Sequence, residues 1–130
     1  MGGAVLWQRV EGALVLCAAV ALLAQPWQPL AWWVLVLAFF APDLSFAAYL
    51  AGPRVGAFGY NLVHVYGFGA GVLALGAALD QPWITALGFL WLGHSGFDRM
   101  LGYGLKLPEG FGHTHLGRIG RDGGTRGQNP

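Results

Sequence analysis

Charged side chains are scarce in this sequence. They make up 10% of the 130 residues, whereas about 25% is usual in soluble proteins. Hydrophobic residues make up 55%, which is more than a soluble domain of this size can cover with polar surface. The scarcity of charge therefore argues against a soluble protein and favours a chain that lies in a lipid bilayer.

Cysteine is almost absent. The single cysteine, Cys17, lies in an apolar run, so no disulfide can form within the chain, and we expect a buried, inert thiol. Glycine pairs of the GxG kind are frequent, but no strand pattern precedes them, which excludes a nucleotide-binding motif. The seven basic residues need no nucleic acid to explain them in a membrane protein, and we expect no nucleic-acid partner.

Long, continuous apolar runs take the place of charge. They predict transmembrane helices at about 9–26, 30–50, 55–79 and 82–105, each near the length of about 20 residues that crosses the hydrocarbon layer. The connections are short and contain proline, as in turns between antiparallel helices. A cleaved signal peptide is the other interpretation of the first run, but the acidic Glu11 argues against it. We predict an all-α integral membrane domain over residues 1–105, a bundle of four transmembrane helices.

Basic residues predict the orientation of this bundle. Four spans place the N-terminus, the second connection and the tail on one side of the membrane. That side receives Arg9, Arg54, Lys106, Arg118, Arg121 and Arg126. By the positive-inside rule both termini are cytoplasmic, and we expect a multi-pass protein of the plasma (inner) membrane. Residues 106–130 form a cytoplasmic tail, interfacial and then disordered; membrane lipids are expected partners, and a homo-oligomer stays open.

Polar side chains within the spans converge at one depth. At about 1.5 Å of rise per residue, Asp43, His64 and Asp98 each lie roughly 10 Å from the cytoplasmic end of their helix. His94 precedes Asp98 by four residues, so both share one helix face. Ionisable groups in lipid are costly and usually face a bundle interior, which predicts one shared polar cluster.

The residue types of this cluster suggest a metal site. His64, His94, Asp98 and Asp43 offer imidazole and carboxylate ligands, which suit a divalent metal such as zinc. A metal-bound water would support hydrolysis of a lipid-like substrate. In this interpretation Asp43 and Asp98 take part in catalysis together with Glu11, a candidate general base.

Further polar residues are secondary candidates: Tyr60, Asn61, Arg99, His113 and His115. Arg99 lies about 100° from Asp98 around the helix, so we expect it to leave the cluster and reach the headgroups. His113 and His115 would cover the cluster as ligands or a lid, or else lie in an interfacial loop.

Three other interpretations stay open. The polar residues could form a structural network that fixes helix packing. His64 and His94 could be the axial ligands of a haem. A proton or ion relay is a further possibility, although the outer half of the bundle has no ionisable side chain, so an oligomer would be needed.

Three segments carry a resemblance to a known family. "APDLSFAAYLAGPRVGAFGYNLVH", "WLGHSGFDRMLGYGLK" and "HTHLGRIG" resemble the small bacterial integral membrane proteins catalogued as domain of unknown function 4260, over about Arg9 to Gly120. The resemblance implies a small multi-helix membrane protein. It implies no catalytic residue, so the functional interpretation depends on the residues themselves.

Overall fold

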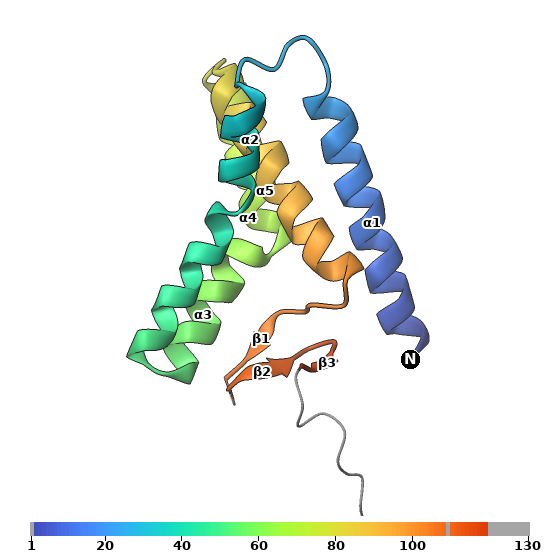
Figure 1. Ribbon diagram of the computed structural model, residues 1–130, viewed down its shortest axis with the longest axis vertical. Coiled ribbons are helices and arrows are strands. Elements are labelled where there is room, and N and C mark those ends of the chain that lie inside the picture. Colours follow the sequence, from blue (N-terminus) through green and yellow to red (C-terminus); the bar gives the residue numbers. More distant parts are fainter. Residues whose placement is uncertain (1, 109, 120–130) are drawn as a thin grey trace, which may run out of the picture.

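Helices make up most of the protein. The computed structural model describes residues 2–108 and 110–119. A short sheet follows the last helix and lies at the same end of the molecule as the N-terminus (Figure 1). The elements in chain order are α1 (Gly3–Leu23), α2 (Trp32–Phe39), the 3₁₀ helix η1 (Ala41–Ala51), α3 (Pro53–His64), α4 (Tyr66–Ala78), α5 (Pro82–Met100), β1 (Lys106–Leu107), β2 (Gly110–Thr114) and β3 (Gly117–Arg118).

Helix α5 is the central element, with α1 and α4 packed along it. Glycines make the contact with α1 close: a Cβ atom built on Gly12 would lie 2.5 Å from the Gly96 carbonyl oxygen, and one built on Gly96 would lie 2.6 Å from the Gly12 carbonyl oxygen. Small residues at such a crossing let two backbones approach, as in membrane helix pairs. The GxxxG spacing at Gly67 and Gly71 has no such role, because nothing lies within 4 Å of a Cβ atom at either position.

Two helical segments are long and apolar enough to cross a membrane, Gly3–Leu23 and Trp32–Ala51. A third span results if the bent pair α3 and α4 counts as one. The chain therefore has the helices of a membrane protein. Large apolar side chains on these segments are exposed, including those of Trp7, Trp32 and Leu50, as lipid-facing side chains would be. Cys17 is also exposed, so the expectation of a buried thiol was wrong.

The second span is not one α-helix. Helix α2 ends at Phe39, and the chain continues as η1, in which the Asp43 N–H donates to the Phe40 carbonyl oxygen at 3.1 Å. Pro42 contributes to the change because it has no N–H to donate. A 3₁₀ helix rises about 2.0 Å per residue, so the segment Trp32–Ala51 is roughly 34 Å long. Asp43 therefore lies about 16 Å from the end of this segment at Ala51, instead of the expected 10 Å.

The expected helix at 55–79 is broken at Val65, where the backbone is extended and α3 meets α4 at a bend of 47°. Side chains of α5 bind the carbonyl groups that the break releases. Trp91 donates to the Val63 carbonyl oxygen at 2.7 Å, and Arg99 donates to the His64 carbonyl oxygen at 3.0 Å. A break in a transmembrane helix is tolerated when neighbouring groups satisfy its backbone in this way.

The start of the tail is a sheet, where we had expected an interfacial loop. Helix α5 ends at Met100, before the expected 105, and Gly102 follows with a φ of 92°. Strands β1, β2 and β3 then form an antiparallel sheet in that order. It packs against α3. The expected disordered segment at the C-terminus lies outside the described residues.

Candidate metal centre

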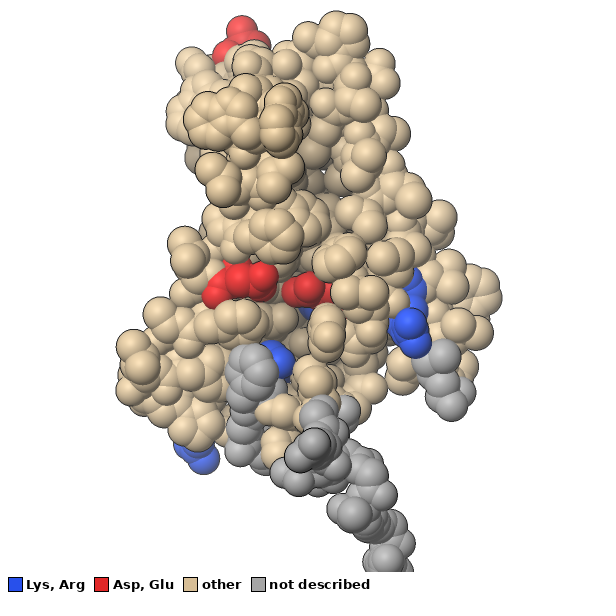
Figure 2. Space-filling model, in the orientation of Figure 1, with Lys and Arg blue, Asp and Glu red and all other residues tan. Residues whose placement is uncertain are grey.

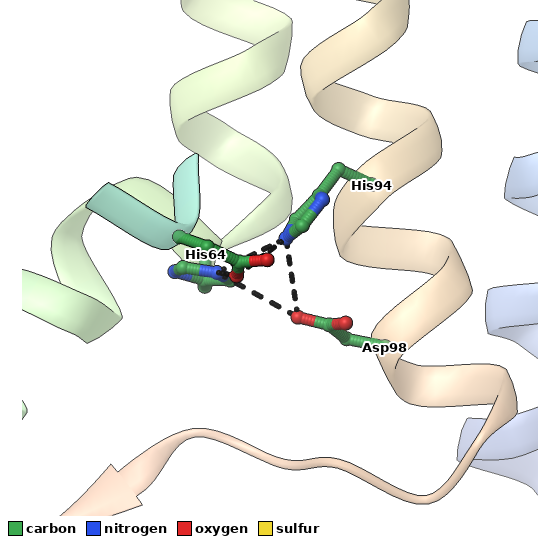
Figure 3. Close-up of side chains that lie close together, drawn as sticks. His64, His94 and Asp98 are labelled. Atoms are coloured by element: carbon green, nitrogen blue, oxygen red, sulfur yellow. Dashed lines mark hydrogen bonds and ion pairs between the residues drawn. The ribbon is translucent and has the colours of Figure 1, made fainter. Parts of the chain in front are cut away.

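Four side chains from three elements meet at one point: Asp43 from η1, His64 from α3, and His94 and Asp98 from α5. One ligand atom from each lies within 4.8 Å of all the others. Figure 3 shows His94 and Asp98 one turn apart on α5, both directed at His64. The structure thus brings together the four residues that the sequence suggested as metal ligands.

The distances between these atoms are similar. His94 Nε2 lies 3.2 Å from His64 Nε2, 3.2 Å from Asp43 Oδ1 and 3.4 Å from Asp98 Oδ2. His64 Nε2 lies 3.4 Å from Asp43 Oδ1 and 3.6 Å from Asp98 Oδ2. Four ligands placed tetrahedrally around an ion, each about 2.0–2.1 Å from it, lie about 3.3–3.4 Å apart. These five distances are close to those expected in a tetrahedral site of two nitrogen and two oxygen ligands.

The hydrogen bond of His64 suits metal binding. Its Nδ1 lies 2.7 Å from the Tyr60 carbonyl oxygen, to which it donates its proton. The Nε2 atom at the centre therefore carries a lone pair, because a neutral imidazole has a single N–H. Metal-binding histidines commonly have such a second hydrogen bond. His94 Nδ1 meets no acceptor at hydrogen-bond geometry, although the backbone of Phe39 lies near this ring.

Burial differs between the two kinds of ligand. The side chains of His64 and His94 are 0% and 2% exposed, whereas those of Asp98 and Asp43 are 12% and 37% exposed. The carboxylates therefore form the accessible side of the cluster. Figure 2 shows acidic groups midway along this face, with basic groups below them.

Arg99 lies in the interior, so the expectation that it would reach the headgroups was wrong. It is 3% exposed, and its guanidinium donates to the carbonyl oxygens of His64 and Tyr103 at 3.0 and 3.1 Å. The side chain spans the break at the end of α3. Arg99 therefore holds the backbone of His64 rather than pairing with a carboxylate.

Tyr60 and Asn61 support the cluster from α3. The Tyr60 ring stacks on His64 with centroids 3.7 Å apart, and its hydroxyl donates to Asp98 Oδ2 at 3.3 Å. Asn61 faces the sheet: its amide donates to the Lys106 carbonyl oxygen at 2.7 Å, and its Oδ1 accepts from the Lys106 N–H at 2.6 Å. Asn61 therefore attaches β1 to α3.

Three of the remaining sequence candidates, Glu11, His113 and His115, do not contact the cluster in the interactions that the structure describes. Glu11 lines a separate, mostly apolar cavity that also includes Tyr66. His113 lies on β2, and His115 accepts a hydrogen bond from the Leu105 N–H at its Nδ1, at 2.8 Å. Neither tail histidine is a ligand in the cluster that the described residues form.

A cavity of about 300 Å³ adjoins the carboxylates. Its lining residues are Asp43, Phe46, Tyr60, Asp98, Tyr103, Lys106 and Ile119. Lys106 is 4% exposed, and its Nζ lies 5.2 Å from the centroid of the Tyr60 ring. Lys106 of β1 and Ile119, which follows β3, form part of the cavity wall.

A comparison with family models places the chain among known sequences. The model described as Domain of unknown function (DUF4260) matches residues 5–119. The chain belongs to this family. No curated protein and no solved structure matches it. All four cluster residues and Lys106 lie within the DUF4260 match.

The position of Lys106 in the wall of this cavity could not be predicted from the sequence, in which the residue only helps to indicate the orientation. It is the only lysine of the chain, and this is the one signal that singled it out. Its position depends on the turn at Gly102 and on the hydrogen bonds of its backbone to Asn61. The spacing of residues in the sequence predicts neither of them.

The geometry of the DUF4260 chain does not fit a haem between His64 and His94. Axial nitrogens on opposite faces of one iron need about 4 Å between them, with metal–nitrogen bonds of about 2 Å, and the macrocycle must lie between the rings. The two Nε2 atoms are 3.2 Å apart, and both also contact Asp43.

Proposed function

We propose that this protein is a four-span membrane protein, with both termini in the cytoplasm, that holds a divalent metal ion such as zinc at Asp43, His64, His94 and Asp98. The observation that supports it best is the set of five distances that join the two imidazole nitrogens to each other and to the carboxylate oxygens, which lie between 3.2 and 3.6 Å. The two carboxylates have oxygen atoms within 4.8 Å of each other. They repel each other at this distance, and a cation between them removes that cost. The hydrogen bond of His64 to Tyr60 supports the same assignment.

The proposed activity is hydrolysis of an ester bond in a lipid-like substrate. A metal lowers the pKa of a bound water and so supplies hydroxide near neutral pH. The water gives its proton to a carboxylate oxygen of Asp43 or Asp98 that the metal does not use. The hydroxide adds to the ester centre, the ester bond breaks, and the leaving oxygen takes the proton.

Such chemistry requires a coordination position for water. Four protein ligands form a closed shell, which is typical of structural zinc, whereas catalytic zinc has an open position. Asp43 is the ligand best placed to open the shell, because it is the most exposed of the four and belongs to a 3₁₀ segment. Its movement toward the cavity would leave His64, His94 and Asp98 with one free position.

The rival function is a structural polar network without a metal. It accounts for the hydrogen bonds, but Lys106, the basic side chain that would offset the two carboxylates in such a network, lies in the adjoining cavity rather than among the four ligand atoms. Arg99, the basic residue nearest in sequence, donates to backbone carbonyls instead. This observation favours the metal.

Metal analysis of the purified protein tests the proposal. The protein is prepared without a polyhistidine tag, loaded with zinc, dialysed and analysed by mass spectrometry. We expect one ion per chain, none in His94→Ala, and one in the control His113→Ala, which changes a histidine outside the cluster. Absence of stoichiometric metal from the unaltered protein, with the fold intact by circular dichroism, would contradict the proposal and leave the structural network.

A further inference from the structure

The cavity beside the cluster has the features of a site for an anionic group. We propose that it binds the phosphate group of a membrane lipid, between the metal on one side and the Lys106 ammonium on the other. This inference rests on the proposed metal site and names the substrate class that the same site would take.

The direction of approach follows from the lining of the cavity. Asp43 and Asp98 line it, whereas His64 and His94 do not and are almost completely buried. A ligand that reaches the metal must therefore pass the carboxylate side. Tyr60 and Lys106 lie on that path, since both line the same cavity.

The charge of the site decides which ligand it accepts. Without a metal, two carboxylates and one ammonium leave a net charge of −1, which repels an anion. A divalent ion on two neutral imidazoles and two carboxylates is neutral, and Lys106 then brings the charge of the described side chains that line the cavity to +1. Because Coulomb interactions are strong in a partly buried site, the cavity attracts an anion only after the metal has bound.

Lys106 is held where this role requires it. Both backbone groups of the residue bind the Asn61 side chain at 2.7 and 2.6 Å, so β1 is fixed to the helix that carries His64. The side chain is buried, and its ammonium lies over the Tyr60 ring. Lysine ammonium groups are common phosphate-binding groups, and hydrogen bonds between two charged partners are among the strong ones.

The size and surroundings of the cavity favour a lipid headgroup. A volume of about 300 Å³ is at the lower end for small-molecule sites, so it takes a headgroup but not the acyl chains. Phe46, which lines the cavity, is 39% exposed and belongs to the apolar segment Trp32–Ala51. Acyl chains can therefore remain in the bilayer beside η1 while the phosphate enters.

Cobalt(II) provides a spectroscopic test. Tetrahedral Co(II) has visible absorption bands that change when a new ligand joins the metal. Titration of the Co(II)-loaded protein with inorganic phosphate should give a saturable change in these bands, and the metal-free protein should bind no phosphate in isothermal calorimetry. Failure of cobalt to bind would contradict the proposed function, whereas cobalt binding without any response to phosphate would contradict this inference alone.

Variants separate the role of Lys106 from folding. Lys106→Met should bind cobalt normally but weaken phosphate binding about tenfold or more, because one charge-assisted contact is lost, and Lys106→Arg should restore part of it. Asn61→Leu keeps the ammonium but releases β1, so it should weaken binding to a smaller extent. Arg54→Gln removes an exposed basic residue of α3 and should change nothing. Unchanged phosphate affinity in Lys106→Met would overturn the proposal.

Vesicles distinguish a lipid from free phosphate. Protein reconstituted with phosphatidylcholine and one tenth phosphatidic acid should show the altered cobalt spectrum without added phosphate, and phosphatidylcholine alone should not. If inorganic phosphate binds but phosphatidic acid neither alters the spectrum nor competes, the lipid assignment is wrong.

Discussion

The Nε2 atoms of His64 and His94 lie 3.2 Å apart, although 30 positions separate the two residues in the chain. His64 Nε2 carries a lone pair because its Nδ1 donates to the Tyr60 carbonyl oxygen. His94 Nε2 approaches this lone pair either as an N–H donor or with a metal ion between the two nitrogens. With Asp43 Oδ1 and Asp98 Oδ2 at similar distances, a metal ion satisfies four atoms, whereas one proton satisfies only two.

Removal of the metal should destabilise the protein. A ligand present at about 1,000 times its Kd stabilises the folded state by about 4 kcal/mol, and here chelation would also leave the Asp43 and Asp98 carboxylates near each other without a cation. We expect EDTA to lower the unfolding temperature and added zinc to restore it. In Asp43→Asn with His94→Ala, EDTA should have no effect. An equal effect of EDTA on that double variant would show that the metal binds elsewhere.

Tyr60→Phe should weaken metal binding without unfolding the protein. The phenyl ring keeps the stack on His64, while the hydroxyl that donates to Asp98 Oδ2 is lost. Groups that orient metal ligands commonly contribute about 10- to 100-fold to metal affinity. Competition with a chromophoric chelator measures the change. Tyr103 lines the cavity beside the carboxylates, as Tyr60 does. The Tyr103→Phe variant is therefore the control, and its affinity for the metal should equal that of the unaltered protein.

Arg99→Met should lower stability more than it lowers metal affinity. It leaves the buried carbonyl oxygen of His64 without its donor, and an unsatisfied buried group costs about 1–3 kcal/mol. Arg99→Lys should recover only part of the loss, because one ammonium cannot reach two carbonyl oxygens with the geometry of a guanidinium. Denaturant unfolding in detergent gives the free energies. An unchanged free energy in Arg99→Met would show that water replaces the side chain.

The convergence of Asp43, His64, His94 and Asp98 could be predicted from the sequence because the constraint on these residues is simple. In an apolar chain each ionisable side chain needs a reason, and the spacing of His94 and Asp98 places both on one face of any helix. The prediction of this group does not depend on the exact helix boundaries. The four residues meet even though Asp43 belongs to a 3₁₀ helix and His64 is the last residue of α3.

The breaks themselves could not be predicted in the same way. Nothing in the local sequence around Val65 marks the end of a helix, and the break depends on Trp91 and Arg99, which bind the released carbonyls from another helix. The prediction for Arg99 failed for the same reason. The angle around the helix gives the direction of its side chain but not its hydrogen-bond partners, the carbonyl oxygens of His64 and Tyr103. The sheet of the tail depends on contacts with α3, which no pattern within the tail reveals.

Acidification should loosen the sheet through His115. His115 is exposed to solvent as a whole, but partial desolvation of its ring lowers its pKa, and the nearby positive charge of Arg99 lowers this pKa further. Because the pKa in the folded state lies below the unfolded value of about 6.5, the unfolded state binds a proton first as the pH falls, and stability present above about pH 6.5 is lost below it. Protonation also removes the lone pair that accepts from the Leu105 N–H.

Amide hydrogen exchange of residues 105–115 between pH 7.5 and 5.5, corrected for intrinsic rates, measures this effect. His115→Asn retains an acceptor but does not titrate, so its protection should not change with pH. His113→Asn, the matched control, should behave like the unaltered protein. The same pH dependence in His115→Asn would assign the effect to another group.

Gly96→Ala should separate α1 from α5. The added Cβ atom would lie 2.6 Å from the Gly12 carbonyl oxygen and 3.0 Å from the Leu16 nitrogen, both of which are backbone atoms that no side-chain rotation can move. Overpacking of a close contact typically costs about 1–3 kcal/mol. Since His94 and Asp98 flank Gly96 on α5, a shift of this helix should also weaken metal binding.

Gly71→Ala is the matched control, because nothing lies within 4 Å of a Cβ atom at Gly71 and alanine favours a helix over glycine by about 0.5–1 kcal/mol. Denaturant unfolding should show Gly96→Ala less stable than the unaltered protein and Gly71→Ala equal or more stable. If both variants were equally stable, α1 would not be packed on α5 through Gly12 and Gly96, and the position of α5 would need another support.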